Sequence, residues 1–360
     1  MKNERILGMK KIVLTGGGTA GHITPNIALM PKLKELGYDI LYIGSYEGME
    51  KNLIEKEDIP YYGISTGKLR RYFDIKNFTD PFRIIKGYFE AKKILKAYRP
   101  DIVFSKGGFV SVPVVRAAHS LKIPVIIHES DMTPGLANKL CFSSATKVCC
   151  NFPETKKYLP ATKAVVTGSP IRAELFCGDA ELARQMNGFD HTLPVLMIVG
   201  GSLGSAAINE TIRQNLNALL HSFHVLHLCG KGNLDQSLLG KKGYMQYEYV
   251  SEHMKDFFAL ADVIVSRAGA NAICEILALK KPNVLIPLAT GRGDQLLNAA
   301  SYQKQGFSLV LEEKDLHKTS LLSSILEVYE HRTEYIERMN SSNQSNGTDA
   351  VISLIEELTH

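Results

Sequence analysis

The feature that most constrains this 360-residue sequence is a succession of strand, glycine-rich loop and helix that occurs twice. In the first copy an apolar run at 11–15 leads into the loop 16–22 and then into an amphipathic segment. In the second copy an apolar run at 195–199 leads into the loop 200–205 and a helical pattern. A chain built this way is predicted to form two similar α/β domains.

Two further strand patterns of the first half recur in the second half in the same order. The pairs are 101–108 with 262–269 and 123–128 with 281–287. The repetition predicts two Rossmann-like domains with a cleft between them, formed by residues 1–166 and 167–335. We expect the helical tail, residues 336–360, to pack back on the N-terminal domain.

The first glycine loop suits an anionic or polar ligand, because glycines bring backbone N–H groups close and the following helix adds a partial positive charge. Gly16, Gly18 and Gly21 also satisfy the dinucleotide fingerprint, and a tight turn without a ligand has the same pattern. His22 stands at the mouth of the helix, where neighbouring groups readily tune the pKa of an imidazole.

Polar groups also follow two other predicted strands of the first half, at Ser105–Gly108 and His128–Asp131. In an open parallel sheet ligands bind outside the carboxyl ends of the strands. We therefore expect these segments and the glycine loop to converge on one site.

Composition excludes several classes of protein. The sequence has 45% hydrophobic residues and no apolar run approaching the roughly 18 residues of a membrane span, and its N-terminus has no signal-like apolar core. Its net charge of +5 is too small and too dispersed to indicate nucleic-acid binding. The six cysteines have no zinc or redox spacing, which is typical of a reduced cytosolic protein.

In the second half, Ser266–Glu275 starts at a strand end and enters a helix, so Glu275 could accept hydrogen bonds from a ribose diol. Polar residues of 291–298 could contact sugar hydroxyls. The sequence has no D-x-D motif, so we expect helix N-termini and cations such as Arg172 to stabilise a diphosphate. A dehydrogenase using Glu47 for its ribose, or a ligand-binding protein, remains an alternative.

The segment Ile75–Lys96 combines apolar and aromatic residues with lysines at helical spacing. One interpretation is a core-packed helix pair with a solvated basic face. The other is a surface that contacts anionic lipid.

A series of motifs in one order gives the sequence a resemblance to a known family. They are Gly17–His22, Gly107–Ser111, His128–Asp131, Gly168–Arg172, Gly200–Gly204, Ser266–Gly269, Glu275 and Asp294–Ala299. The sequence resembles the MurG family of cell-wall transferases from about Lys10 to its end. Its 292–295 segment is similar to that of the Gram-positive branch.

The resemblance implies a GT-B fold and an inverting transfer of N-acetylglucosamine (GlcNAc) from UDP-GlcNAc to the C4 hydroxyl of MurNAc in lipid I, forming lipid II. It implies no cofactor and no metal in the chemical step. It also implies a peripheral enzyme at the cytoplasmic face of the membrane, contacting anionic lipid through 75–96. A GT-B transferase with another glycolipid acceptor and a nucleotide-sugar-binding protein without turnover are the alternatives.

The resemblance also implies roles for individual residues. His22 would be the general base, with Glu129 as the alternative. Donor contacts would come from Thr19, Ala20, Gly21, Arg172, Ser202, Val250, Ala270, Glu275 and Gln295. Acceptor contacts would come from Gly107, Gly108, His128, Asp131 and Asn138. Many members have asparagine at Asp131, so this chain loses a hydrogen-bond donor there and adds a charge.

Overall fold

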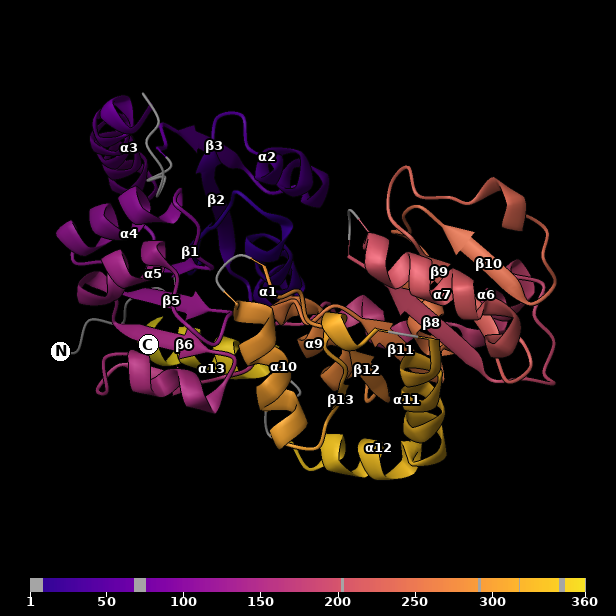
Figure 1. Cartoon of the computed structure of the whole chain (residues 1–360). Helices are drawn as coiled ribbons and strands as arrows, with labels where there is room; N and C mark the ends of the chain where they lie inside the picture. Colours follow the sequence, from indigo (N-terminus) through magenta and orange to yellow (C-terminus); the bar gives the residue numbers. More distant parts are fainter. Residues whose placement is uncertain are drawn as a thin grey trace. The chain divides into compact units, whose positions relative to one another are not determined.

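The computed structural model describes residues 9–67, 76–201, 204–290, 293–316, 318–342 and 347–359. The chain divides into two compact units, which Figure 1 shows in the colours of the sequence. Unit 1 comprises Met1–Arg172 and Asn346–His360, and unit 2 comprises Ala173–Ser345. Within the described ranges, no helix has the length and apolar character needed to cross a membrane.

Unit 1 is built on a seven-stranded sheet with the order β3-β2-β1-β4-β5-β6-β7, in which every pairing is parallel. The strands are β1 (Lys11–Thr15), β2 (Asp39–Ser45), β3 (Tyr61–Ile64), β4 (Ile102–Ser105), β5 (Val125–Glu129), β6 (Lys147–Cys150) and β7 (Ala164–Val166). The α-helices are α1 (Thr24–Glu35), α2 (Met49–Ile54), α3 (Lys76–Tyr98), α4 (Ser111–Ser120), α5 (Leu136–Cys141) and α13 (Gly347–Thr359). Short 3-10 helices are η1 (Ala20–His22), η2 (Glu55–Glu57), η3 (Phe142–Ser144) and η4 (Pro153–Tyr158).

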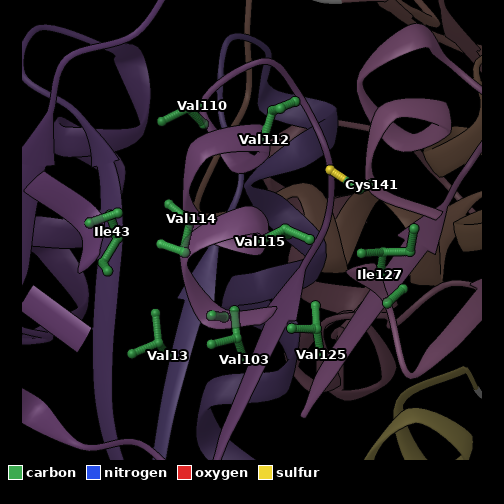
Figure 2. Packing of buried hydrophobic residues seen from close by; sticks show 14 of the residues in the cluster. Val13, Ile43, Val103, Val110, Val112, Val114, Val115, Val125, Ile127 and Cys141 are labelled. Carbon is green, nitrogen blue, oxygen red and sulfur yellow. The ribbon is translucent and has the colours of Figure 1, made fainter. Parts of the chain in front are cut away.

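Both faces of this sheet are apolar and both are covered, as parallel sheets require. On one face Val13 and Val103 lie opposite Val114 and Val115 of α4, as Figure 2 shows. On the other face Ile12 and Leu14 pack in a second cluster with residues of α1 and α13. Successive strand residues point to opposite faces, so β1 contributes to both clusters.

The C-terminal helix α13 belongs to the core of unit 1. Val351 and Ile355 are fully buried in the same cluster as α1. The hydroxyls of Tyr38 and Thr359 are 2.7 Å apart and hydrogen-bonded. Helix α13 therefore closes one face of the N-terminal sheet although it is last in the sequence.

Both boundaries between the units lie further along the chain than predicted, at 172 instead of 166 and at 346 instead of 336. Side-chain contacts explain these differences. The backbone N–H of Ile171 donates to Thr348 Oγ1 at 3.0 Å, which holds the chain up to Arg172 in unit 1 rather than ending it at 166. Helix α12 stays with unit 2, because Met339 is fully buried and its carbonyl accepts from Lys280 Nζ at 2.9 Å. The part of the tail that joins unit 1 is accordingly shorter than predicted.

Unit 2 has a six-stranded parallel sheet with the order β10-β9-β8-β11-β12-β13. The strands are β8 (Val195–Val199), β9 (His224–Leu228), β10 (Tyr244–Tyr247), β11 (Val263–Ser266), β12 (Asn283–Leu285) and β13 (Leu309–Val310). The α-helices are α6 (Ala180–Met186), α7 (Ala206–Leu219), α8 (Met254–Leu260), α9 (Ala270–Ala278), α10 (Asp294–Lys304), α11 (Lys318–Glu330) and α12 (Arg332–Asn340). The 3-10 helices are η5 (Ala173–Cys177), η6 (Gln236–Leu238) and η7 (Glu313–Asp315).

The two sheets repeat one topology. The order β3-β2-β1-β4-β5 of unit 1 corresponds to β10-β9-β8-β11-β12 of unit 2. In both units the strand before the glycine loop lies inside the sheet. The next two strands of the sequence extend the sheet on one side of it, and the strand after those pairs with its other side. This confirms the two Rossmann-like α/β units predicted from the repeated pattern, each with a topological switch point beside its glycine loop.

Candidate active site

In unit 1 the three predicted segments follow three neighbouring strands, β1, β4 and β5. Thr15 pairs with Ser105, and Ser105 pairs with Ile127, so these strands end at one edge of the sheet. The switch point between β1 and β4 lies at the same edge, where open α/β sheets bind their ligands. The glycine loop, Gly107–Gly108 and the segment after β5 therefore belong to one candidate site.

The glycine loop holds the imidazole of His22 in a defined orientation. His22 Nδ1 lies 3.1 Å from the carbonyl oxygen of Gly17 and 3.3 Å from Thr19 Oγ1. A carbonyl can only accept, so Nδ1 carries the proton and the neutral ring has its lone pair on Nε2. Gly18 and Thr19 are exposed, and His22 is half-buried. This tautomer suits a group that accepts a proton through Nε2.

A buried polar network fixes the start of this loop, and the sequence analysis did not detect it. The Tyr42 hydroxyl donates to the carbonyl of Gly16 at 2.7 Å. The Asn26 amide donates to Thr15 O at 3.2 Å and to Tyr42 Oη at 3.1 Å. Burial raises the pKa of Tyr42, so its hydroxyl stays protonated and keeps donating.

The Gly107–Gly108 turn packs directly on the glycine loop. Both residues have positive φ, +96° and +82°. A Cβ at Gly108 would lie 2.2 Å from the carbonyl oxygen of Gly17 and 3.2 Å from His22 Nδ1. Glycine is therefore required at Gly108 for both backbone conformation and space.

Glu129, the alternative general base, is used to organise the loop after β5. Its side chain is buried and accepts from the backbone N–H groups of Asp131 and Gly135, each at 3.0 Å, and from Asn138 Nδ2 at 2.8 Å. Asn138 also donates to the carbonyl of His128 at 3.2 Å. These three hydrogen bonds direct the carboxylate oxygens at the loop itself.

His128 lies inside unit 1 rather than at its surface. Its Nδ1 is 2.8 Å from the ammonium of Lys106, a side chain with 1% exposure, and its Nε2 is 2.8 Å from the carbonyl of Gly168. Nε2 therefore donates and Nδ1 accepts. Burial and then the Lys106 charge hold the pKa of His128 well below its ordinary value. In this arrangement His128 connects β5 to the segment after β7.

His227 of unit 2 is a second buried neutral histidine. Its Nδ1 lies 2.9 Å from Tyr244 Oη and its Nε2 3.0 Å from Asn209 Oδ1. Burial, with a smaller contribution from Arg213, lowers its pKa to about 3.

These two histidines predict a loss of stability in mild acid. Below about pH 6.5 the unfolded chain takes up protons that the folded units do not bind. Each histidine therefore lowers the free energy of unfolding by about 1.4 kcal/mol for every pH unit below this value. Stability should rise with pH up to about 6.5 and not change further through these groups. His227→Gln should lower the thermal midpoint at pH 7.5, and its deficit relative to wild type should shrink by pH 5.5. A constant deficit across this range would contradict the assignment.

In unit 2 the corresponding edge lies at the ends of β8, β11 and β12, which are neighbours in the sheet. Ser205 caps α7 by accepting from Ile208 N–H at 3.4 Å. Arg267 belongs to the motif Ser266–Gly269, and the sequence analysis assigned it no role. It donates to Ser205 Oγ at 2.6 Å and to the carbonyl of Ile286 at 3.1 Å, and it pairs with Glu313. Arg267 thus connects the first turn of α7 to the end of β12.

The predicted donor residues lie on several loops of this unit. Ala270 begins α9 and is buried, and Glu275 is half-buried in the same helix. Gln295 stands in the first turn of α10, where its Oε1 accepts from Leu288 N–H at 3.0 Å. Val250 is half-buried between β10 and α8.

The remaining predicted residues lie either outside the described residues or in unit 1. Ser202 lies outside the described residues, as do Arg292 and the start of the predicted lipid-facing segment, Ile75. Arg172 is the last residue of unit 1 before the chain enters unit 2. Thr19, Ala20 and Gly21 lie in unit 1 at the glycine loop and η1.

Residues 12–150 match the glycosyltransferase family 28 N-terminal domain, and residues 195–354 match the glycosyltransferase family 28 C-terminal domain. The chain belongs to glycosyltransferase family 28. Its two parallel-sheet units are the two halves of the GT-B fold, as predicted.

Relatives cover nearly the whole chain. The UDP-N-acetylglucosamine--N-acetylmuramyl-(pentapeptide) pyrophosphoryl-undecaprenol N-acetylglucosamine transferase of Lachnoclostridium phytofermentans is 60% identical over 352 residues, 97% of this chain and 99% of the relative. The enzyme of the same name from Lachnospira eligens is 59% identical over 351 residues, 97% of this chain and 99% of that one. The crystal structure of Acinetobacter baumannii MurG matches with a TM-score of 0.77 at 27% identity, over 97% of this chain and 99% of that one. The resemblance to the MurG family is thereby confirmed.

Proposed function

We propose that this family 28 enzyme is a hexosyltransferase that moves GlcNAc from UDP-GlcNAc to the C4 hydroxyl of MurNAc in lipid I, with inversion, to form lipid II. The observation that carries the proposal is 60% identity over 97% of the chain to a transferase named for this donor and acceptor. The reaction serves peptidoglycan synthesis.

The acceptor half of the reaction is proposed for unit 1, with His22 as general base. Its Nδ1–H is directed at the Gly17 carbonyl, which leaves proton acceptance to Nε2. His22 takes the C4 hydroxyl proton while the oxygen attacks C1 of GlcNAc and the bond from C1 to UDP breaks. Glu129 is the weaker candidate because its oxygens accept from Asp131, Gly135 and Asn138. Gly107, Gly108, His128, Asp131 and Asn138 are the proposed acceptor contacts.

The donor half is proposed for unit 2. Helix α9 begins after Gly269 without a side-chain cap, so its first backbone N–H groups can face the diphosphate as negative charge develops on UDP. Glu275 would accept from the ribose hydroxyls, and Gln295 would contact GlcNAc. Val250 would lie at the uracil. Thr19, Ala20, Gly21, Arg172, Ser202 and Ala270 are further proposed donor contacts.

The function is tested by transfer of labelled GlcNAc from UDP-GlcNAc to a short-chain lipid I analogue, with EDTA in one arm. We expect product with a β linkage in both arms. Parallel reactions offer another glycolipid as acceptor and NAD as a competing ligand. Binding of UDP-GlcNAc without transfer to lipid I would overturn the acceptor assignment and favour a sibling transferase or a binding protein.

We further propose that α3 holds the enzyme on the anionic cytoplasmic face of the cell membrane as a peripheral protein. Phe82, Ile85 and Phe89 recur at helical spacing and expose 75%, 55% and 63% of their surface. Exposed Lys86 and Lys93 stand beside them. The opposite side of α3 packs in the core of unit 1, so the outward apolar residues are not needed for folding.

Replacing Phe82 and Phe89 together by serine should weaken binding to phosphatidylglycerol vesicles about 10–100-fold, because two aromatic side chains lose their burial in lipid. Sedimentation with vesicles measures this, and raised salt should weaken the wild type too. Leu239→Ser, which alters an exposed apolar residue of unit 2, is the matched control and should bind as wild type does. Unchanged binding of the double variant would remove α3 from the proposal.

A further inference from the structure

We propose that the buried carboxylate of Glu50 raises the basicity of His22 by acting through the Gly17–Gly18 peptide group. The inference rests on the proposed function, in which His22 is the base, and assigns Glu50 as a positioning residue for that base. Neither the glycine motif nor the family resemblance pointed to Glu50, which lies on α2.

One peptide group connects the two side chains. Its N–H, that of Gly18, donates to Glu50 Oε2 at 3.3 Å. Its carbonyl, that of Gly17, accepts from His22 Nδ1 at 3.1 Å. Donation to an anion polarises the planar amide, so its carbonyl becomes a stronger acceptor for the imidazole. The carboxylate of Glu50 thereby affects the basicity of the imidazole without contacting it directly.

The carboxylate is held tightly in place. Glu50 exposes 1% of its surface, and its Oε1 accepts from the backbone N–H of Ser45 at 3.0 Å and from the Ser45 hydroxyl at 2.5 Å. A Cβ at Gly17 would lie 2.6 Å from the carboxyl carbon, so the loop rests directly on this group. Burial reduces screening by water and strengthens the interaction.

Other titratable groups packed around the loop carry different charges. Tyr42 of β2 donates to the Gly16 carbonyl, and burial raises its pKa, so it is neutral. Lys106 packs against Gly16, since a Cβ at Gly16 would lie 3.3 Å from the Cβ of Lys106. Its ammonium is directed at His128, which burial keeps neutral. Within the described part of this region, Glu50 therefore supplies the negative charge that faces the loop.

The effect on catalysis follows from the charge that forms during proton transfer. When the C4 hydroxyl proton reaches Nε2, His22 becomes an imidazolium. The Nδ1 proton stays on the ring and the amide proton stays on Gly18, so no proton passes through the peptide. The carboxylate of Glu50 stabilises the imidazolium relative to the neutral ring.

The test is the pH profile of kcat for Glu50→Gln, which keeps the shape of the side chain and removes its charge. His22 must be unprotonated to act, and without the carboxylate it protonates at lower pH. The acid limb should therefore move down by about 0.5–1 pH unit, and the plateau rate should fall about 3–10-fold. KM for UDP-GlcNAc should not change. Ser45→Ala removes one contact to Glu50 but keeps the charge, so its acid limb should stay at the wild-type position.

An acid limb that does not move in Glu50→Gln would reduce Glu50 to packing and overturn the proposal. Absence of transfer by the wild type, or full activity of a His22 variant, would instead overturn the proposed function. A second measurement needs neither turnover nor a substitution. In an NMR titration of the wild type, the chemical shift of the Gly18 amide proton should move downfield as the His22 ring takes up its proton, with the same midpoint pH as the ring. An amide that does not respond would also overturn the proposal.

Discussion

His22→Gln should lower kcat about 10²–10⁴-fold while KM for UDP-GlcNAc changes little. A glutamine amide can still donate to the Gly17 carbonyl, where His22 Nδ1 now lies at 3.1 Å, but it cannot accept a proton at neutral pH. The loss should therefore fall on proton transfer and not on donor binding. Steady-state transfer to a short-chain lipid I analogue measures both constants.

The matched control is His119→Gln, which alters an exposed histidine at the end of α4 in the same unit and should leave kcat unchanged. Should His22→Gln keep kcat within threefold of wild type, the base must be sought elsewhere, with Glu129 as the next candidate. Glu129→Gln would then have to show the large loss in kcat without losing the folded loop after β5.

Gly108→Ala should destabilise unit 1 by about 3 kcal/mol and reduce kcat more than tenfold. The backbone at Gly108 has φ of +82°, which disfavours a side chain, and the added Cβ would lie 2.2 Å from the carbonyl oxygen of Gly17. That carbonyl also accepts from His22, so relief of the clash must displace the base. Urea unfolding and hydrogen exchange of unit 1, beside the transfer assay, measure the two effects.

Gly37→Ala separates backbone strain from the clash. Gly37 has φ of +77°, and nothing lies within 4 Å of a Cβ placed there. It should cost about 1 kcal/mol of stability and leave kcat unchanged. Equal effects of the two alanine substitutions on stability and activity would show that the contact between the turn at Gly108 and the glycine loop has no consequence.

Much of the fold was predictable because its signals are local. Each apolar run before a glycine loop, at 11–15 and 195–199, forms an interior strand of a sheet, β1 and β8. The helical pattern predicted from Ile75 corresponds to α3, Lys76–Tyr98. The segment forms one helix rather than a pair: its inner side packs in the core and its outer side exposes Phe82 and Phe89, and contact of that outer side with lipid stays a proposal.

The supports of the candidate site were not predictable from local patterns. Glu50 reaches the glycine loop from a helix far along the chain, and in sequence it is one acidic residue in an ordinary charged stretch. The sequence pattern places Lys106 and His128 among the polar residues at strand ends. In the structure both are buried and hydrogen-bonded to each other. Their roles depend on which strands are neighbours, and strand order is set by packing of the whole sheet.

The sequence by itself determined the two strand, glycine-loop and helix repeats, and the placement of His22 after the first glycine loop, because spacing and residue type encode short-range geometry. Only the tertiary structure decided which polar groups face a ligand and which hold the loops. Glu129 is committed to three N–H donors, and Glu50 lies beneath the glycine loop. Burial and hydrogen-bond partners arise from segments distant in the chain, and they determine whether a carboxylate or an imidazole can exchange a proton.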